Sequence, residues 1–210
     1  MNAQEKLEVL TRLGNDLNHV KDIDILMERL LTEARRIANA DAGSIYIRDD
    51  ENLKFSYCQN ETQQAKLKAG AKLVYSTFTM PINKSSIAGY AAATGDSVNI
   101  KDVYDMEPDL PYGFDSNYDK KTGYRTGSML TIPLMTPRND IVGVMQIINA
   151  RDEGGVTVPF SEADEKVLMH FAGLSAVALE RAQMTRAMIL RMIRMAGLRD
   201  PKETGTHVIR

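Results

Sequence analysis

Two apolar runs near the middle of the chain dominate its hydrophobic pattern. Residues 127–134 and residues 141–149 are rich in branched side chains, and a polar turn at residues 137–140 separates them. Two runs of strand length joined by a short turn are typical of an antiparallel β-hairpin. Both runs are too apolar for a sheet with one solvated face, so we expect other elements to cover each face.

Shorter runs on the N-terminal side of this hairpin predict the rest of a sheet. Residues 42–48 and residues 53–58 flank an acidic turn, and the second run alternates strictly between apolar and polar positions, which indicates a second hairpin. Residues 77–82 predict an edge strand, because Pro81 has no amide donor for a central ladder. Residues 97–100 predict a further short strand.

Apolar residues spaced by three and four predict helices around this sheet. One stripe consists of Leu26, Leu30, Ala34 and Ile37. Asp22 or Asp24 is suited to cap that helix at its start. Residues 86–95 predict a short helix that ends at Gly95.

The longest helical pattern lies in the last third of the chain. Ser161 and Asp164 fit the capping box that opens a helix. Its apolar stripe, interrupted at Arg181, comprises Val167, Phe171, Leu174, Val177, Met184, Met188, Met192 and Met195. One small sheet cannot bury a stripe of that length. We therefore predict a parallel homodimer, built from this helix and from an N-terminal helix over residues 3–18 that shows the same spacing.

Two connecting regions and three polar side chains stand out against this pattern. Residues 61–72 are polar and predict a loop or a short helix, whereas residues 102–118 predict a long irregular segment of the kind that often forms a lid. Thr122, Thr126 and Gln146 lie inside or beside the central apolar runs. Buried polar groups need partners, and a small ligand is one candidate partner.

Composition narrows the function classes. A length of 210 residues fits one domain with helical extensions, and a net charge of −2 gives no reason to expect binding to nucleic acid or to an anionic membrane. A single cysteine excludes a disulfide framework, which predicts a cytoplasmic protein. No apolar run approaches the ~20 residues that span a bilayer, so we expect no membrane segment. We find no nucleophile–base pair, complete metal set or phosphate loop, and therefore expect no catalytic residue in this chain.

Three stretches together resemble the GAF domain, a small-molecule sensor module related to PAS. They are residues 86–95, residues 119–133, and Asn149 followed by Phe160 and the Asp164–Glu165 pair. The resemblance is greatest to the cyclic-nucleotide-binding GAF domains of phosphodiesterases and adenylyl cyclases. It implies an α+β fold, in which a central antiparallel sheet of about six strands is flanked by helices, with long helices at both ends of the chain.

The third stretch departs from the family at one position. It corresponds to the family's Asn-Lys…Phe…Asp-Glu signature, in which Ala150 stands here at the lysine position. In the family this lysine pairs with the acidic motif and braces the fold behind the pocket. Arg151 is the neighbouring candidate for that role, but adjacent strand residues point to opposite faces, so it restores the pair only if the chain is locally shifted.

The C-terminal residues 198–210 resemble the opening of an HD-GYP domain, a metal-dependent phosphodiesterase that hydrolyses cyclic di-GMP in bacteria. Glu203 and His207 lie four residues apart, so they share one helix face and would be metal ligands in the full-length parent. The remaining ligands of such a site are absent from this chain. The alternative interpretation is that Glu203 is only a first-turn carboxylate near a helix N-terminus.

These patterns divide the chain into an N-terminal helix at residues 1–21, a GAF sensor domain at residues 22–180, a connecting signalling helix at residues 181–198, and a truncated HD-GYP start at residues 199–210. The resemblance implies a regulatory domain of a bacterial signalling protein. Such a domain binds a small ligand and signals through a helical dimer to a phosphohydrolase. The alternative is a dimerisation scaffold that binds no ligand.

The resemblance also implies a set of ligand-binding residues. They are Ser44, Cys58, Gln59, Ile87, Ala88, Asp119, Thr122, Thr126 and Gln146. A cyclic mononucleotide or a purine of similar size is the ligand that it implies, and we expect no further cofactor. Alternatively, the threonines only turn the chain into its strand, and Gln146 forms hydrogen bonds with backbone groups inside a ligand-free core.

Overall fold

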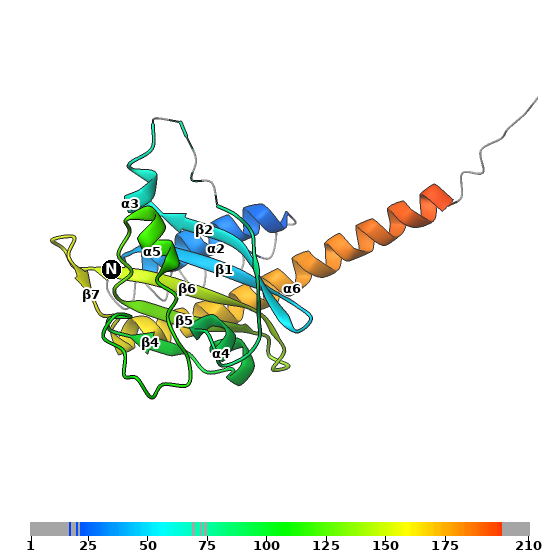
Figure 1. Ribbon diagram of the computed structural model, residues 1–210. Coiled ribbons are helices and arrows are strands. Elements are labelled where there is room, and N and C mark those ends of the chain that lie inside the picture. Colours follow the sequence, from blue (N-terminus) through cyan, green and yellow to red (C-terminus); the bar gives the residue numbers. More distant parts are fainter. Residues whose placement is uncertain are drawn as a thin grey trace, which may run out of the picture.

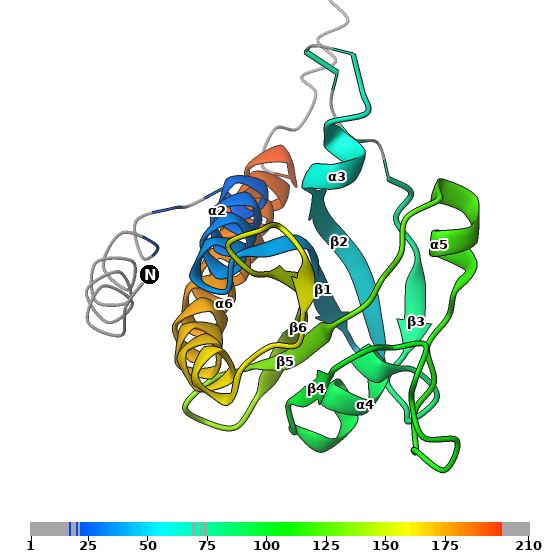
Figure 2. The same cartoon turned by 90° about the vertical axis from the view of Figure 1, so that its left-hand side faces the viewer.

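The computed structural model describes residues 17, 20, 22–68, 70–71, 73 and 75–198. An antiparallel sheet curls through this region in the strand order β3-β2-β1-β6-β5-β4, and the short β7 pairs with β6. Helices α2 and α6 lie on one face of the sheet, and α4 and α5 lie on the other (Figure 1, Figure 2). We call these the helix-side face and the lid-side face. The predicted α+β fold is confirmed.

The strands are β1 (Ala40–Asp49), β2 (Asn52–Asn60), β3 (Thr79–Pro81), β4 (Val98–Ile100), β5 (Met129–Met135), β6 (Ile141–Arg151) and β7 (Thr157–Val158). The helices are α2 (Ile23–Ile37), α3 (Glu61–Gln64), α4 (Ile87–Thr94), α5 (Asn117–Thr122) and α6 (Glu162–Leu198). Both predicted hairpins form, and β3 lies at the predicted edge. The sequence pattern did not predict α5 or β7.

Local side-chain caps set where the helices begin and end. The Asp22 carboxylate accepts hydrogen bonds from the amides of Asp24 and Ile25, so Asp22 rather than Asp24 caps α2. The short helix α4 ends as predicted at Gly95, whose φ of 80° lies in the left-handed region that glycine adopts easily. The predicted capping box is also present, because Ser161 Oγ accepts from the Asp164 amide at 3.1 Å.

The main core lies on the helix-side face, where α2 and α6 cover the sheet. The predicted α2 stripe is fully buried. The α6 stripe needs a correction, because Leu174 is 39% exposed whereas Phe171 is fully buried. The small side chains of Ala172 and Ala176 let α6 lie close against its neighbours, so the buried stripe is rotated toward the alanines.

The last turns of α6 project away from the sheet (Figure 1). Beyond Ala182 the large apolar side chains are exposed, as far as the structure describes them. They are Met184, Met188, Ile189, Leu190, Met192, Ile193 and Met195. No helix in the described ranges is long and apolar enough to cross a membrane. Apart from Leu17, the predicted helix at residues 3–18 lies outside the described residues, as do Glu203 and His207.

Candidate functional site

A row of polar side chains crosses the lid-side face of the sheet. Ser44 on β1 pairs in register with Cys58 on β2 and with Gln146 on β6, so the three side chains lie next to one another on one face. Ile87 and Ala88 at the start of α4 are buried against this side of the sheet. The structure thus brings together five of the predicted ligand-binding residues.

Hydrogen bonds fix the amide of Gln146 within this row. Its Oε1 accepts from the Tyr46 hydroxyl at 3.1 Å, and its Nε2 donates to Thr131 Oγ1 at 3.1 Å. Because an amide presents a donor at one end and an acceptor at the other, these two bonds fix its orientation. Gln146 therefore has protein partners, as the ligand-free interpretation expects, although they are side chains rather than backbone groups.

Burial raises the pKa of two side chains on the lid-side face, Tyr46 and Cys58. Desolvation raises the pKa of the Tyr46 phenol to about 12, and it raises the pKa of the Cys58 thiol to about 12. A thiol with such a pKa carries almost no nucleophilic thiolate at neutral pH. This face consequently offers neutral hydrogen-bonding groups rather than a reactive nucleophile.

Aromatic side chains that we did not predict as site residues gather beside this row. The rings of Phe55 and Phe78 stack with centroids 5.0 Å apart, and Tyr46 and Tyr75 meet Phe55 edge-on at 5.3 and 5.4 Å. Phe78 is 48% exposed. Stacked and exposed rings of this kind offer a flat surface to a planar ligand. Strict alternation would place Phe55 with Tyr57 on the helix-side face, and it is the register shift opposite Ile45 and Tyr46 that brings Phe55 to the side of Cys58.

The buried carboxylate of Asp119 holds together the segment around α5, residues 102–126, which we call the lid. Asp119 accepts hydrogen bonds from the Thr126 amide at 2.7 Å, the Thr126 hydroxyl at 2.9 Å and the Tyr104 hydroxyl at 2.8 Å. Thr122 bonds the carbonyl of Tyr118 and the amide of Tyr124, which closes the turn after α5. Each of the three predicted lid residues therefore has partners within the lid, and their role in ligand binding stays a prediction.

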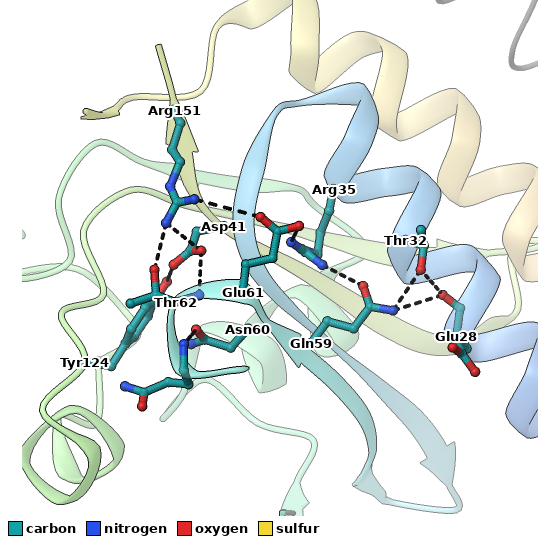
Figure 3. Close-up of polar contacts among 11 residues, drawn as sticks. Glu28, Thr32, Arg35, Asp41, Gln59, Asn60, Glu61, Thr62, Tyr124 and Arg151 are labelled. Atoms are coloured by element: carbon teal, nitrogen blue, oxygen red, sulfur yellow. Dashed lines mark hydrogen bonds and ion pairs between the residues drawn. The ribbon is translucent and has the colours of Figure 1, made fainter. Parts of the chain in front are cut away.

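Gln59 lies on the other side of the sheet from Ser44. Its amide donates to Thr32 Oγ1 at 2.8 Å and accepts from Arg35 at 2.8 Å, so the side chain faces α2 (Figure 3). The structure does not bring Gln59 together with the polar row.

The signature asparagine fixes the chain where the lid enters β5. Asn149 has a left-handed φ of 57°. Its Nδ2 donates to the Tyr124 hydroxyl at 2.9 Å and to the Arg125 carbonyl at 2.8 Å, and its Oδ1 accepts from the Gly127 amide at 2.7 Å. One side chain thus fixes three successive parts of the segment. Asparagine adopts left-handed backbone more readily than most residues, which suits it to this position.

Arg151 has partners that the sequence did not indicate. It pairs with the buried Asp41 at 2.6 Å and donates to Thr62 Oγ1 at 2.7 Å (Figure 3). At the β4 edge of the sheet, Glu165 from the acidic motif accepts from Ser97 at 2.6 Å and from Asn99 at 3.0 Å. The described contacts of Arg151 therefore brace the start of β1 and α3, while Glu165 holds β4.

Within the described ranges, no group of three or more His, Cys, Asp or Glu side chains is arranged to hold a metal ion. The site consists instead of neutral polar groups, aromatic rings, and a lid that is organised by Asp119 and tied to the sheet by Asn149.

This combination of a curled antiparallel sheet, flanking helices and a lid over one face defines a sensor-type α+β domain. The family model described as "GAF domain" matches residues 22–179, and the chain belongs to that family.

Two relatives are cyclic-nucleotide phosphodiesterases. The chain is 28% identical over 181 residues to a cGMP-specific 3',5'-cyclic phosphodiesterase of Drosophila virilis, with 84% of this chain and 19% of the relative covered. It is 27% identical over 193 residues to the dual 3',5'-cyclic-AMP and -GMP phosphodiesterase 11 of Drosophila melanogaster, with 86% and 12% covered. The chain thus spans less than a fifth of the length of either enzyme.

Solved structures support the fold. The GAF domain of a phosphoenolpyruvate-protein phosphotransferase from Coxiella burnetii is similar with a TM-score of 0.66 at 18% identity, covering 89% of this chain and 99% of that one. A free methionine-R-sulfoxide reductase from Neisseria meningitidis has a TM-score of 0.60 at 16% identity, covering 85% and 90%. At these identities the likeness concerns the fold alone.

Proposed function

We propose that this chain is the regulatory domain of a signalling phosphodiesterase and binds a cyclic mononucleotide, or a purine of similar size, on its lid-side face. The observation that carries the proposal is the row of Ser44, Cys58 and Gln146, which faces α4 and lies beside exposed aromatic rings. The relationship to two cyclic-nucleotide phosphodiesterases supports it.

The chemistry of the face suits such a ligand. A purine carries neutral donors and acceptors on a flat ring, which the polar row and the aromatic rings complement. A cyclic phosphate needs donors, and helix N-termini supply backbone N–H groups. Ser86 caps the amide of Gly89, which leaves the first-turn amides of Ile87 and Ala88 as candidate donors.

In this proposal, α6 and the N-terminal helix transmit the signal. We place a parallel homodimer along the projecting part of α6 and along the helix at residues 3–18. Behind it we place a C-terminal HD-GYP phosphohydrolase that acts on cyclic di-GMP, with Glu203 and His207 among its metal ligands. The exposed apolar side chains of α6 support the dimer. The effector rests on the sequence resemblance of residues 198–210.

The dimer has a direct test. Met184→Glu together with Met188→Glu should shift the protein toward monomer in analytical ultracentrifugation, because charge replaces apolar surface at the seam. Met169→Glu, on the part of α6 that packs on the domain, is the matched control for an exposed methionine of this helix. A wild-type chain that sediments as a monomer at micromolar concentration contradicts the dimer.

The ligand-free scaffold remains the second candidate function. It is favoured by the protein partners that already satisfy Gln146, Asp119 and Thr126. A scaffold needs no exchange of these partners for ligand groups.

Calorimetry with cAMP and cGMP separates the two functions. Ser44→Ala should weaken binding by about two- to tenfold, because one neutral hydrogen bond contributes about 0.5–1.5 kcal/mol. Ser175→Ala is the matched control, since its buried hydroxyl donates to the Phe171 carbonyl on the helix-side face. Heat with neither nucleotide, or equal affinities for both variants and the wild type, favours the scaffold.

A further inference from the structure

Four charged side chains of alternating sign form a chain at one end of the sheet. Arg35 Nη2 lies 2.5 Å from Glu61 Oε1, and Arg151 lies 3.9 Å from Glu61 Oε2 and 2.6 Å from Asp41 (Figure 3). The two outer members are buried, with 9% of the Arg35 side chain and 2% of the Asp41 side chain exposed. Glu61, in the middle, is 65% exposed and free to change partners.

This charged chain connects α2 to the lid. Arg35 belongs to the last turns of α2, and Glu61 opens α3. At the far end, Asp41 accepts from the Tyr124 hydroxyl at 2.8 Å, where the lid enters β5. Gln63 of α3 also donates to the carbonyl of Thr122, at 3.3 Å. A contiguous polar path therefore runs from the lid, through α3, to a helix that packs against α6.

One atom in this path is left without a partner. The Nε of Arg35 is buried and has no hydrogen bond within the described part of the chain. Buried donors are normally satisfied, and an orphan of this kind asks for an explanation. The Arg35 guanidinium meets Glu61 through one nitrogen only, whereas arginine and a carboxylate can form two parallel hydrogen bonds. The second oxygen of Glu61 faces Arg151 instead.

We propose that Glu61 is a two-position switch that reports the state of the lid to α2. This rests on the proposed function, in which the lid closes over a ligand. With the lid closed, Tyr124 satisfies Asp41, and Glu61 is shared between Arg35 and Arg151. When Tyr124 leaves with the lid, Asp41 Oδ2 loses its donor, while Oδ1 keeps Arg151 Nη2 and the Thr62 amide. The second nitrogen of Arg151, which faces Glu61, then turns to Asp41 Oδ2, because an unsatisfied buried carboxylate oxygen is costly. Glu61 then turns to Arg35 and bonds both Nη2 and the orphan Nε.

The two positions are distinct arrangements of the same groups, which a switch requires. The contact that breaks, between Glu61 and Arg151, is the longest of the chain at 3.9 Å. The contact that forms is a bidentate pair with a buried arginine. Arg35 also donates to Gln59, which in turn bonds Thr32 and the carbonyl of Glu28, so a change at Arg35 reaches the preceding turns of α2.

Hydrogen exchange followed by mass spectrometry tests this without any ligand. Tyr124→Phe keeps the ring and removes the hydroxyl that donates to Asp41 and accepts from Asn149. It should raise exchange in residues 117–126 and also change it in α2 around residues 32–38. Tyr118→Phe is the control, since it removes a hydroxyl from the same lid while its ring, 6.4 Å from that of Tyr124, stays in place. A response confined to residues 117–126, or the same α2 response in the control, overturns the switch.

A second variant tests whether the α2 response depends on Glu61 or only on a general loss of stability. Glu61→Gln removes the charge that moves between the two arginines, so in this background Tyr124→Phe should no longer alter exchange in α2. The two substitutions should also be non-additive, with an unfolding constant that departs by threefold or more from the product of the single effects. Independent distant sites agree within about twofold. Additivity with a persistent α2 response contradicts the proposal.

The outcome can be distinguished from that of the ligand test. If calorimetry finds no nucleotide binding while exchange in α2 still follows Tyr124, the switch stands and the ligand assignment fails. If nucleotides bind while α2 does not respond to Tyr124→Phe, the ligand assignment stands and the switch fails.

Discussion

The two faces of the sheet are built on different principles. The helix-side face is sealed by aliphatic and aromatic side chains such as Leu30, Ile147 and Phe171, none of which is exposed. The lid-side face places Ser44 and Gln146 at its centre and satisfies Gln146 through Tyr46 and Thr131. Apolar contacts are individually weak and collectively permanent, whereas a hydrogen-bonded row can exchange one partner for another. The first face therefore provides stability, and the second presents polar groups that can exchange hydrogen-bond partners.

Removing a core ring should show the difference most strongly. Phe171→Ala should destabilise the protein by about 3–5 kcal/mol, because the substitution removes a fully buried ring and leaves a cavity. Phe114→Ala, at a half-buried ring over the lid-side face, should lower the free energy of unfolding by only about 1 kcal/mol. Urea denaturation measures both. Equal losses would contradict the division between the faces.

The loss of stability from a substitution in the polar row should depend on how many hydrogen-bonding groups it leaves without a partner. Gln146→Leu leaves the hydroxyls of Tyr46 and Thr131 without their amide, and should destabilise the protein by about 1–3 kcal/mol. Adding Tyr46→Phe removes one of the orphaned hydroxyls and should recover part of that loss. Urea denaturation of the single and double variants checks the order. A double variant less stable than Gln146→Leu alone would show that the row stabilises by packing rather than by hydrogen bonding.

Alkaline pH should weaken the lid-side face specifically. The pKa of Cys58 is about 12 in the folded protein, well above its value in an unfolded chain of about 8.5. The unfolded chain then binds fewer protons than the folded one, so stability is complete below about pH 8.5 and falls as the pH rises toward 12. The slope is at most about 1.4 kcal/mol per pH unit.

Cys58→Ala should flatten this slope between about pH 8.5 and pH 9, where the Tyr46 phenol, whose pKa in an unfolded chain is about 10, is still almost fully protonated. Tyr46→Phe is the matched variant, and it should act only at higher pH, because the pKa of tyrosine in an unfolded chain is about 10, above that of cysteine, while the pKa of Tyr46 in the folded protein is about 12. Urea denaturation midpoints measured as a function of pH test both variants. An unchanged slope in Cys58→Ala would show that the thiol is not desolvated.

Removing a helix cap should lower the free energy of unfolding least of all, and by the same amount on both faces of the sheet. Ser161→Ala removes the cap of α6, and Ser86→Ala removes that of α4, where Ser86 Oγ accepts from the Gly89 amide at 3.0 Å. Each should lower the free energy of unfolding by about 1 kcal/mol. Thermal denaturation measures both losses. Similar losses would mean that the two faces differ in how they are packed, whereas unequal losses would mean that the helix ends also contribute to the difference.

The features that could be predicted from the sequence are those with a local cause. The Ser161–Asp164 box, the Gly95 helix end and both hairpins depend on residues only a few positions apart. The Arg151–Asp41 pair joins residues far apart in the chain, and no periodicity indicates it. The helix α5 is too short for an apolar period and takes its place from the buried Asp119.

The site was predicted in part for the same reason. Strand alternation places Cys58 and Gln59 on opposite faces, so the resemblance named two neighbours of which only one reaches the polar row. The resemblance named Ser44 and Gln146 together, and the pairing of β1 with β6 in the structure brings them side by side. Tyr46, which fixes Gln146, carried no polar signal in an apolar run, and only the structure shows its hydroxyl at work.

The length of α6 gives it a mechanical property. At about 1.5 Å per residue its 37 residues form a rod about 55 Å long. Residues 183–198 lie beyond the buried part and account for about 24 Å of it. When α6 tilts at the sheet, its far end moves by the tilt angle times the projecting length. A tilt of about 5° would therefore move that end by about 2 Å. A rearrangement as small as one carboxylate changing partner can in this way become a displacement of about 2 Å at the far end of α6.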